Sequence, residues 1–273
     1  MKIEMIAMDL DGTALRPDGL ALSPRMESAL EAAHRKGIRI IPVTGRPYGL
    51  LPDFLQQHPS WESCGVLCNG AQIRDLTTGK ILRYIPVPRE KVQQILHICE
   101  KYDLPVELNA DGHLYLTRDT LRKELEIPRL HLHCTVLLPQ IGVIVESLQT
   151  ADYPEVEKVH INGVPENVWD QVEQELKELD LSVVCEKRPH LEVTHSQATK
   201  GQGLRMLCEY MHIPIEYVMA MGDSGNDLTM LQEAGFSVAM GSAPEEIKAA
   251  ADYVTQSNLL DGAAAAIERF VLA

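Results

Sequence analysis

The 273-residue sequence contains few aromatic residues, a deficit of positive charge and no long apolar run. Aromatic residues make up only 5% of the chain, so we expect a core built from aliphatic side chains. The formal net charge of −14 argues against a surface for nucleic acid or an anionic membrane, because either would require a basic face. No stretch reaches the roughly 18 apolar residues of a membrane span, and Asp9 and Asp11 interrupt the first apolar run before a secretion signal can form. We therefore expect a cytoplasmic protein that binds neither nucleic acid nor membrane.

The six cysteines lack the paired spacing of a disulfide framework or of a structural zinc site. We expect them to be reduced and mostly buried thiols. Cys64 with Cys68, and the run at residues 131–134 (HLHC), bring together residue types that bind zinc. Neither set has the spacing of two ligand pairs, which favours positions in the core or on an edge strand.

The chain is long enough for one large domain or two moderate ones. Strand and helix patterns alternate up to residue 84 and again from residue 190. Between them, hairpin and helix patterns bounded by prolines indicate an insert. We predict an α/β fold: a Rossmann-like, doubly wound parallel sheet core (residues 1–84 and 190–273) with an inserted α+β cap domain (residues 85–189).

Four local patterns predict particular elements. We expect a helix through residues 50–55, a strand over residues 134–137 of the insert, and a core strand at residues 191–193. Pro42 interrupts an aliphatic strand pattern. Because proline cannot donate a hydrogen bond to a ladder, we expect Pro42 at the last paired position of its strand or at a bulge.

Reactive side chains follow predicted strands, at the edge where open α/β sheets bind their ligands. These are Asp9 with Asp11, Thr44, Lys200 after residues 191–193, and Asp223 with Asp227. Taken alone, the Asp-Leu-Asp-Gly sequence is equally consistent with a polar turn. Four converging carboxylates, however, repel one another unless a cation is present. Mg²⁺ suits them, because it takes oxygen ligands, keeps waters and accepts a substrate phosphate oxygen.

The same set of residues supports phosphate chemistry. The Thr44 hydroxyl, the backbone N–H groups near it and the Lys200 amine can bind the remaining phosphate oxygens. One carboxylate is then positioned as a nucleophile and its neighbour as a general acid and base.

Four segments resemble, in order, the motifs of the haloacid dehalogenase-like hydrolase superfamily: residues 9–13 (DLDGT), 43–46 (VTGR), 200–201 (KG) and 222–227 (GDSGND). Further segments resemble its Cof-type phosphatases: residues 69–71, 238–243, 251–254, 257–258 and 261–262. The resemblance covers the whole core, while the insert matches mainly in size and position. It implies a Mg²⁺-dependent phosphatase that hydrolyses a small phosphorylated metabolite, such as a sugar phosphate or a nucleotide or cofactor phosphate.

The resemblance also implies roles for the acidic residues. Asp9 attacks phosphorus and becomes an aspartyl phosphate, while Asp11 protonates the leaving alcohol and later activates water. Mg²⁺ is held by the Asp9 carboxylate, the Asp11 backbone carbonyl and the Asp223 carboxylate. Asp227 acts through a metal-bound water, or else only caps the helix that it begins, where a carboxylate is favoured in any case.

Phosphate binding is assigned to Thr44, Gly45 and Lys200 by the same resemblance. The alternative for Lys200 is an ordinary surface lysine. Asn226 either contacts the phosphate or fixes the metal-binding loop. Arg46 either contacts phosphate or substrate, or forms a surface salt bridge.

Two other functions stay open on the sequence. One is a phosphotransferase or phosphomutase on the same scaffold, and the other is a non-catalytic module that senses phosphate or metal. The retained Asp11 disfavours the sensor, because a pure binder needs no acid there. We expect a monomer or weak homodimer whose only partner is its small substrate. The insert is expected to close over the site and to supply specificity residues, with candidates at residues 111–112 and 160–162.

Overall fold

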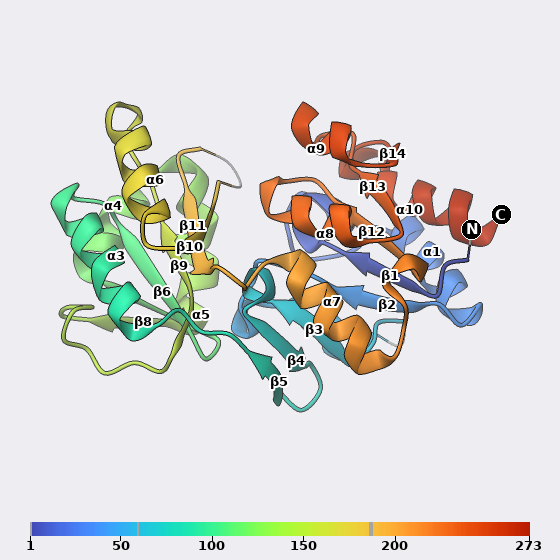
Figure 1. The fold of residues 1–273 in the computed structure, drawn as a ribbon, viewed down its shortest axis with the longest axis horizontal. Helices are drawn as coiled ribbons and strands as arrows, with labels where there is room; N and C mark the ends of the chain where they lie inside the picture. Colours follow the sequence, from blue (N-terminus) through green and yellow to red (C-terminus); the bar gives the residue numbers. More distant parts are fainter. Residues whose placement is uncertain (1, 59, 186–187) are drawn as a thin grey trace. The chain divides into compact units, whose positions relative to one another are not determined.

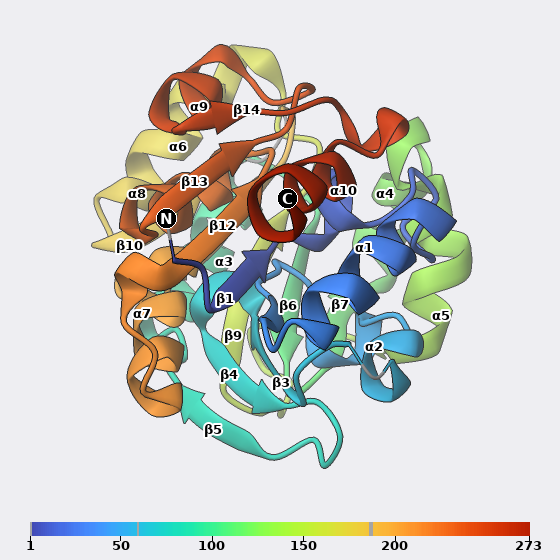
Figure 2. The same ribbon diagram turned by 90° about the vertical axis from the view of Figure 1, so that its right-hand side faces the viewer.

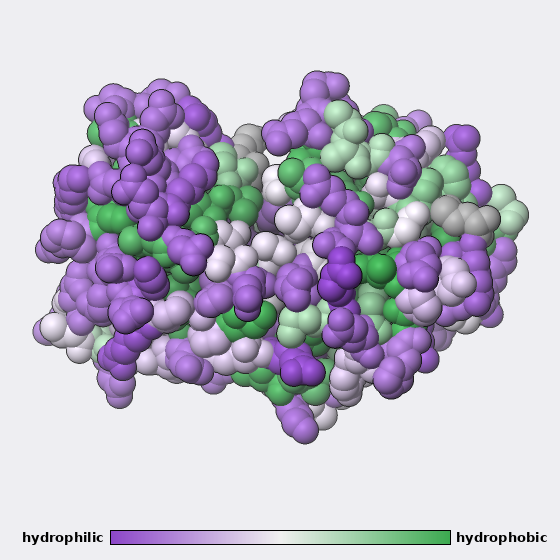
Figure 3. All heavy atoms as spheres, in the orientation of Figure 1, coloured by the Kyte–Doolittle hydropathy of each residue, from purple (hydrophilic) through white to green (hydrophobic). Residues whose placement is uncertain are grey.

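The computed structural model describes residues 2–58, 60–185 and 188–273, and the chain forms two compact units (Figures 1 and 2). The first contains the described residues up to 45, residues 52–84 and residues 199–273. The second contains residues 46–51 and the described part of 85–198. Hydrophilic side chains predominate on the face drawn in Figure 3, as the high charge leads one to expect. Within the described residues, no helix is long and apolar enough to cross a membrane.

A parallel sheet of five strands forms the centre of the first unit, in the order β14-β13-β12-β1-β2. Its strands are β1 (Met5–Met8), β2 (Arg39–Pro42), β12 (Val218–Gly222), β13 (Phe236–Ala239) and β14 (Tyr253–Val254). Every residue of β1 and β12 is buried, which explains their continuous apolar sequences, since helices cover both faces of a parallel sheet. The predicted α/β class with a parallel core is confirmed.

The helices of this unit are α1 (Pro24–Arg35), α2 (Phe54–Gln57), α7 (Lys200–Met211), α8 (Leu228–Glu233), α9 (Glu245–Ala250) and α10 (Gly262–Ile267). Helix α1 packs against α10, and α7 packs against α8. Figure 2 shows these two pairs on opposite sides of β1. Helix α1 begins with a cap, because Ser23 Oγ accepts a hydrogen bond from the Met26 N–H at 3.0 Å and Pro24 occupies the first turn.

Three antiparallel strands complete the first unit: β3 (Cys64–Leu67), β4 (Gln72–Asp75) and β5 (Ile81–Tyr84). A parallel bridge between Val43 and Val66 links β3 to the chain that follows β2. Pro42 is the last residue of β2 and lies opposite Met8, as predicted. The helix predicted through residues 50–55 is wrong. The chain instead forms a 3₁₀ turn (Tyr48–Leu50) and the short α2, because the intervening Pro52 disfavours helical geometry at the residue before it.

The second unit contains a six-stranded sheet in the order β10-β11-β9-β6-β7-β8, antiparallel except for the parallel β7–β8 pair. Its strands are β6 (Val106–Ala110), β7 (His113–Thr117), β8 (Gly142–Val145), β9 (Val156–Ile161), β10 (Leu181–Val184) and β11 (Leu191–His195). Its helices are α3 (Arg89–Lys101), α4 (Arg118–Leu125), α5 (Leu138–Ile141) and α6 (Trp169–Lys177).

The two faces of this sheet differ in polarity, because successive side chains of a strand point to opposite faces. Leu108 of β6 and Val159 of β9 join the apolar core, together with residues of α3 and α6. Glu107 and His160, which alternate with them, lie opposite each other on the other face. We call this second face the polar face of the six-stranded sheet.

Two predicted strands differ from the structure. Residues 191–193 do not form a core strand: they belong to β11, which pairs with β9 and β10 in the second unit. Residues 134–137 lie in a π-helical turn (His133–Leu137) and not in a strand. Cys134, Leu138 and Ile141 are buried at a helical spacing that the β-branched residues between them obscured. The predicted domain bounds themselves stay a prediction.

Candidate active site

Asp9 lies at the carboxyl end of β1, between the ends of the neighbouring strands β12 and β2. Its backbone N–H donates to the Met221 carbonyl at 3.0 Å, and its side chain is buried. The chain then turns through residues Leu10–Ala14, where Gly12 has a φ of +77°. A Cβ on Gly12 would lie 2.4 Å from Asp223 Oδ2, so glycine is needed here for the approach of the two segments as well as for the turn.

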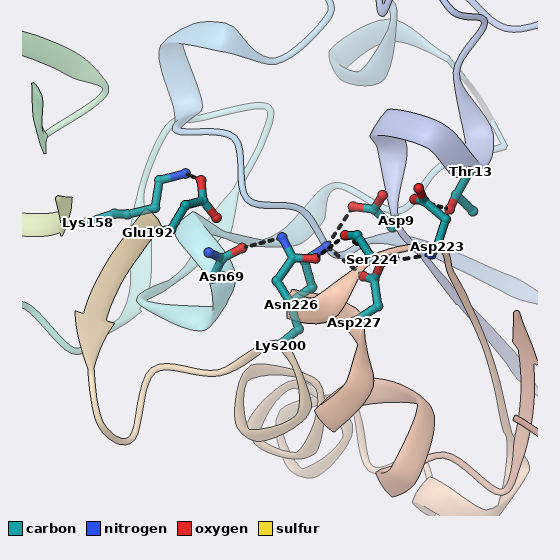
Figure 4. Close-up of polar contacts among 10 residues, drawn as sticks. All are labelled: Asp9, Thr13, Asn69, Lys158, Glu192, Lys200, Asp223, Ser224, Asn226 and Asp227. Atoms are coloured by element: carbon teal, nitrogen blue, oxygen red, sulfur yellow. Dashed lines mark hydrogen bonds and ion pairs between the residues drawn. The ribbon is translucent and has the colours of Figure 1, made fainter. Parts of the chain in front are cut away.

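Three carboxylates from distant parts of the sequence meet at this point. Asp9, Asp223 and Asp227 each offer an oxygen within 4.8 Å of the others. Asp223 follows β12, the neighbour of β1, and accepts a hydrogen bond from Thr13 Oγ1 at 3.2 Å. Figure 4 shows Asp9, Asp223 and Asp227 directed toward one another. We call these three residues the acidic cluster.

Lys200 brings one positive charge to the acidic cluster. Its Nζ lies 2.7 Å from Asp9 Oδ1 and 2.7 Å from Asp227 Oδ1, and the residue is only 1% exposed. Burial lowers the pKa of the amine, but the two carboxylates outweigh burial and raise it above its ordinary value. Lys200 is therefore charged, and it is not a surface lysine. It is the first residue of α7, capped by Thr199, and not the end of a core strand.

The electrostatics of Asp9 indicate that the site suits a cation. Burial raises the pKa of this carboxyl well above its ordinary value, and the charges of Asp227, Asp223 and Asp11 act in the same direction against Lys200. One lysine is therefore not enough to balance the acidic groups around it. The donors are carboxylate oxygens, which fit Mg²⁺.

Asp227 has both of its carboxylate oxygens engaged. Oδ1 accepts from Lys200, and Oδ2 accepts from the backbone N–H groups of Asp223 at 2.9 Å and Ser224 at 3.0 Å. These contacts form a capping box over the turn Gly225–Asp227. Asp227 therefore takes part in the cap of this turn and belongs to the acidic cluster, and its action through a metal-bound water stays a prediction. Its position orders the loop that carries Asp223.

Asn226 joins the loop to the segment after β3. Its Nδ2 donates to Asn69 Oδ1 at 3.1 Å, and its Oδ1 accepts from Ser224 Oγ at 2.7 Å. Asn69 was not among the predicted site residues, although the Asn-Gly pair after a predicted strand was a signal. Asn69 has a φ of +57°, and a Cβ on Gly70 would lie 2.1 Å from the Thr199 carbonyl oxygen. This pair therefore packs against the start of α7.

Thr44 is buried just beyond β2, the other neighbour of β1. Its N–H donates to the Val66 carbonyl at 2.9 Å, and its carbonyl accepts from the Asn69 N–H at 3.1 Å. Gly45 follows at the boundary of the first unit. Arg46 belongs to the second unit, where its Nη1 donates to the Leu50 carbonyl at 3.0 Å, and its role stays a prediction.

The chain is similar to known proteins over nearly its whole length. A model of the haloacid dehalogenase-like hydrolases matches residues 6–267. The chain is 28% identical to the pyridoxal phosphate phosphatase YbhA of Escherichia coli, over 97% of both chains. It is 28% identical to the 5-amino-6-(5-phospho-D-ribitylamino)uracil phosphatase YcsE of Bacillus subtilis, over 99% of this chain and 96% of that protein.

Among solved structures, the subclass IIB sugar phosphatase BT4131 matches with a TM-score of 0.84 and 27% identity, over 99% of this chain and 100% of the other. The four motifs of the sequence and the similarity over whole chains thus indicate the same family. We conclude that the protein belongs to the haloacid dehalogenase-like hydrolase superfamily, within its Cof-type phosphatases.

Proposed function

We propose that the protein is a Mg²⁺-dependent phosphatase that hydrolyses a small phosphorylated metabolite through an aspartyl phosphate on Asp9. The observation that carries the proposal is the ion pair between the buried Asp9 and Lys200 inside an acidic cluster. A buried carboxylate held by a single amine, at the strand end where α/β sheets bind ligands, is suited to attack an electrophilic phosphorus.

The reaction has two steps. A carboxylate oxygen of Asp9 forms a bond to phosphorus as the bond from phosphorus to the alcohol oxygen breaks, and Asp11 gives its proton to that oxygen. Asp11 then takes a proton from water, the water oxygen attacks phosphorus, and the bond to Asp9 breaks to release inorganic phosphate. Lys200 offsets the charge that gathers around Asp9, and phosphoryl transfer depends mainly on such positioning and electrostatics.

The resident cation in this proposal is Mg²⁺. The Asp9 and Asp223 carboxylates and the Asp11 carbonyl would hold it, with Asp227 acting through water. When bound, it supplies the positive charge that the acidic cluster and a substrate phosphate require. Thr44, with the backbone at Gly45, would hold phosphate oxygens together with Lys200.

We assign Asn226 to the metal-binding loop, because both polar atoms of its amide are already bonded to Asn69 and Ser224. Arg46 stays a candidate for phosphate or substrate contact.

The substrate is proposed to be a sugar phosphate or a nucleotide or cofactor phosphate. Support comes from the relatives, which are named for pyridoxal phosphate, a phosphoribitylamino-uracil and a sugar. Residues 85–189 would act as the cap that selects it. Of the predicted specificity residues, His160 is partly exposed on the polar face, whereas Asn162 is fully buried and bonded to Glu124. We propose a cytoplasmic location and a monomer or weak homodimer.

A panel of phosphorylated metabolites tests this function. We expect phosphate release with Mg²⁺ and none after chelation, and we expect ¹⁸O from labelled water to appear in the released phosphate. Transfer of the phosphoryl group to a second sugar, with dependence on a bisphosphate and no free phosphate, would show a phosphotransferase or mutase. Binding of phosphate and Mg²⁺ without turnover of any compound would show a sensor.

A further inference from the structure

The second unit contains a buried cluster of ionisable residues that the proposed reaction does not use. Glu107 on β6, Glu124 on α4 and His133 in the turn His133–Leu137 each offer a ligand atom within 4.8 Å of the others. Both glutamates are 0% exposed, and the His133 side chain is 17% exposed. We call these three residues the Glu-Glu-His cluster.

Two carboxylate oxygens of this cluster are buried without a hydrogen bond. Glu107 Oε1 lies 2.7 Å from His133 Nε2, but Oε2 has only an ion pair to His160 Nδ1 at 3.5 Å. Glu124 Oε1 accepts from Asn162 Nδ2 at 2.6 Å, and no hydrogen-bond donor reaches Oε2. Buried carboxylate oxygens without a donor destabilise a fold. The cluster therefore has acceptor atoms left over, and they belong to fully buried side chains.

The cluster contains two carboxyl groups and one imidazole, and a second imidazole, that of His160, contacts Glu107. Burial, followed by the charge of Glu107, raises the pKa of Glu124 to about 9. Burial has the same tendency at Glu107, but the hydrogen bond with His133 and the ion pair with His160 outweigh it and lower that pKa below its ordinary value. A divalent cation would neutralise both carboxylates together.

The donor set indicates which cation fits. One imidazole nitrogen and two carboxylate oxygens match the ligands of zinc, which takes three protein ligands when its fourth position is left to water. Mg²⁺ favours oxygen ligands alone. We propose that the second unit binds one zinc-class transition-metal ion between Glu107, Glu124 and His133. The ion ties helix α4 and the turn His133–Leu137 to the central strand β6.

Metal retention by the full-length protein tests the proposal. Protein stripped with a chelator is equilibrated with excess Mg²⁺ and titrated with Zn²⁺ or Co²⁺, and bound metal is counted after gel filtration. We expect one equivalent of Zn²⁺ to persist against Mg²⁺. We expect intense visible absorption from the Co²⁺ form if Co²⁺ occupies a site of low coordination number with an imidazole ligand. Co²⁺ bound to six oxygen ligands absorbs only weakly.

Variants assign the metal to the cluster. His133→Ala and Glu124→Gln should each weaken Zn²⁺ binding by at least about tenfold, the smallest loss expected for a group at a metal centre. His131→Ala, on an exposed residue of the same segment, should leave it unchanged. Asp223→Asn, which removes a carboxylate of the acidic cluster in the first unit, should keep the Zn²⁺ equivalent.

The proposal is overturned if no Zn²⁺ persists against Mg²⁺, if His133→Ala and Glu124→Gln retain it, or if only Asp223→Asn loses it. Circular dichroism of each variant checks that the chain is folded. Glu124→Gln keeps the oxygen that accepts a hydrogen bond from the Asn162 amide. This variant therefore tests the proposal even if His133→Ala does not fold. The experiment measures bound metal and not phosphatase activity. An inactive protein would therefore contradict the proposed function and leave the metal proposal unaffected.

Discussion

Lys200 Nζ lies 2.7 Å from Asp9 Oδ1, although 191 positions of sequence separate the two residues. The same amine lies 2.7 Å from Asp227 Oδ1. One buried positive charge is thus shared by two buried carboxylates, in contact with further acidic groups. The side chains of the site carry more negative than positive charge, and a bound cation would offset the difference.

Replacing Asp9 with asparagine should abolish turnover while leaving the fold intact. An amide lacks the charge and nucleophilicity of the carboxylate, so we expect the rate of phosphate release to fall by at least about 1,000-fold, as for other nucleophiles. Steady-state assay on the best substrate measures this. Asp18→Asn, on an exposed loop carboxylate, is the control and should keep full activity. A near-normal rate for Asp9→Asn would refute covalent catalysis by this residue.

Removing the Lys200 amine should destabilise the protein in the presence of a chelator. Lys200→Ala leaves Asp9 and Asp227 buried without their cation, and breaking a buried pair in this way costs about 3–5 kcal/mol. Urea unfolding measures the free energy of unfolding. Lys248→Ala removes a lysine from a surface ion pair with Glu245, so it should change stability by no more than about 0.5 kcal/mol. Equal losses in the two variants would contradict the assigned role of Lys200.

Alanine at Gly12 should disable the site, whereas alanine at Gly37 should not. Both glycines have positive φ, so each substitution strains the backbone by about 1–2 kcal/mol. A Cβ at Gly12 also meets the Asp223 carboxylate at 2.4 Å, while a Cβ at Gly37 meets nothing within 4 Å. We expect Gly12→Ala to raise the Mg²⁺ concentration needed for half-maximal activity, with Gly37→Ala unchanged. Parallel Mg²⁺ titrations of the two variants decide the matter.

His190 should make stability fall in mild acid. Burial, assisted by the charge of Arg129, lowers the pKa of His190 from 6.5 to about 3. Between these values the unfolded chain binds a proton that the folded chain does not, so the histidine stabilises the fold above pH 6.5, and this contribution is lost as pH falls toward 3. The loss has a slope of up to about 1.4 kcal/mol per pH unit.

The measurement is the free energy of unfolding from pH 7 to pH 4 in wild type and in His190→Gln. The difference between the two curves should shrink as pH falls. His97→Gln, on an exposed histidine of α3, should follow the wild-type slope. A constant offset between wild type and His190→Gln would show that His190 is not held neutral.

The core and its acidic residues were predictable because their signals are local. A buried apolar strand that ends in Asp9, and another that ends in Asp223, place both side chains at one sheet edge whenever the strands are parallel. Even Pro42 could be located, since a proline excludes the interior of a ladder. The same reasoning placed residues 191–193 in the wrong sheet, because the sequence of a short apolar strand does not show which sheet the strand joins.

The Glu-Glu-His cluster lay beyond sequence reasoning for a similar reason. Glu107 alternates with apolar residues of β6, which reads as the solvated face of an amphipathic strand. Its partner His133 is 26 residues away, directly before a segment predicted as a strand. The run at residues 131–134 contains residue types that bind zinc, but its spacing lacks a second pair of ligands. Carboxylates from other elements take the place of that pair only once the chain has folded.

The alternation along the six-stranded sheet has a consequence for how its strands find one another. Glu107 lies opposite His160, which lies opposite Glu192 on the next strand. A slip of one residue between β6 and β9 would turn Val159 to the polar face and force His160 among the aliphatic side chains that pack with α3 and α6. The row of ionisable groups thus adds a penalty to every misalignment by an odd number of residues.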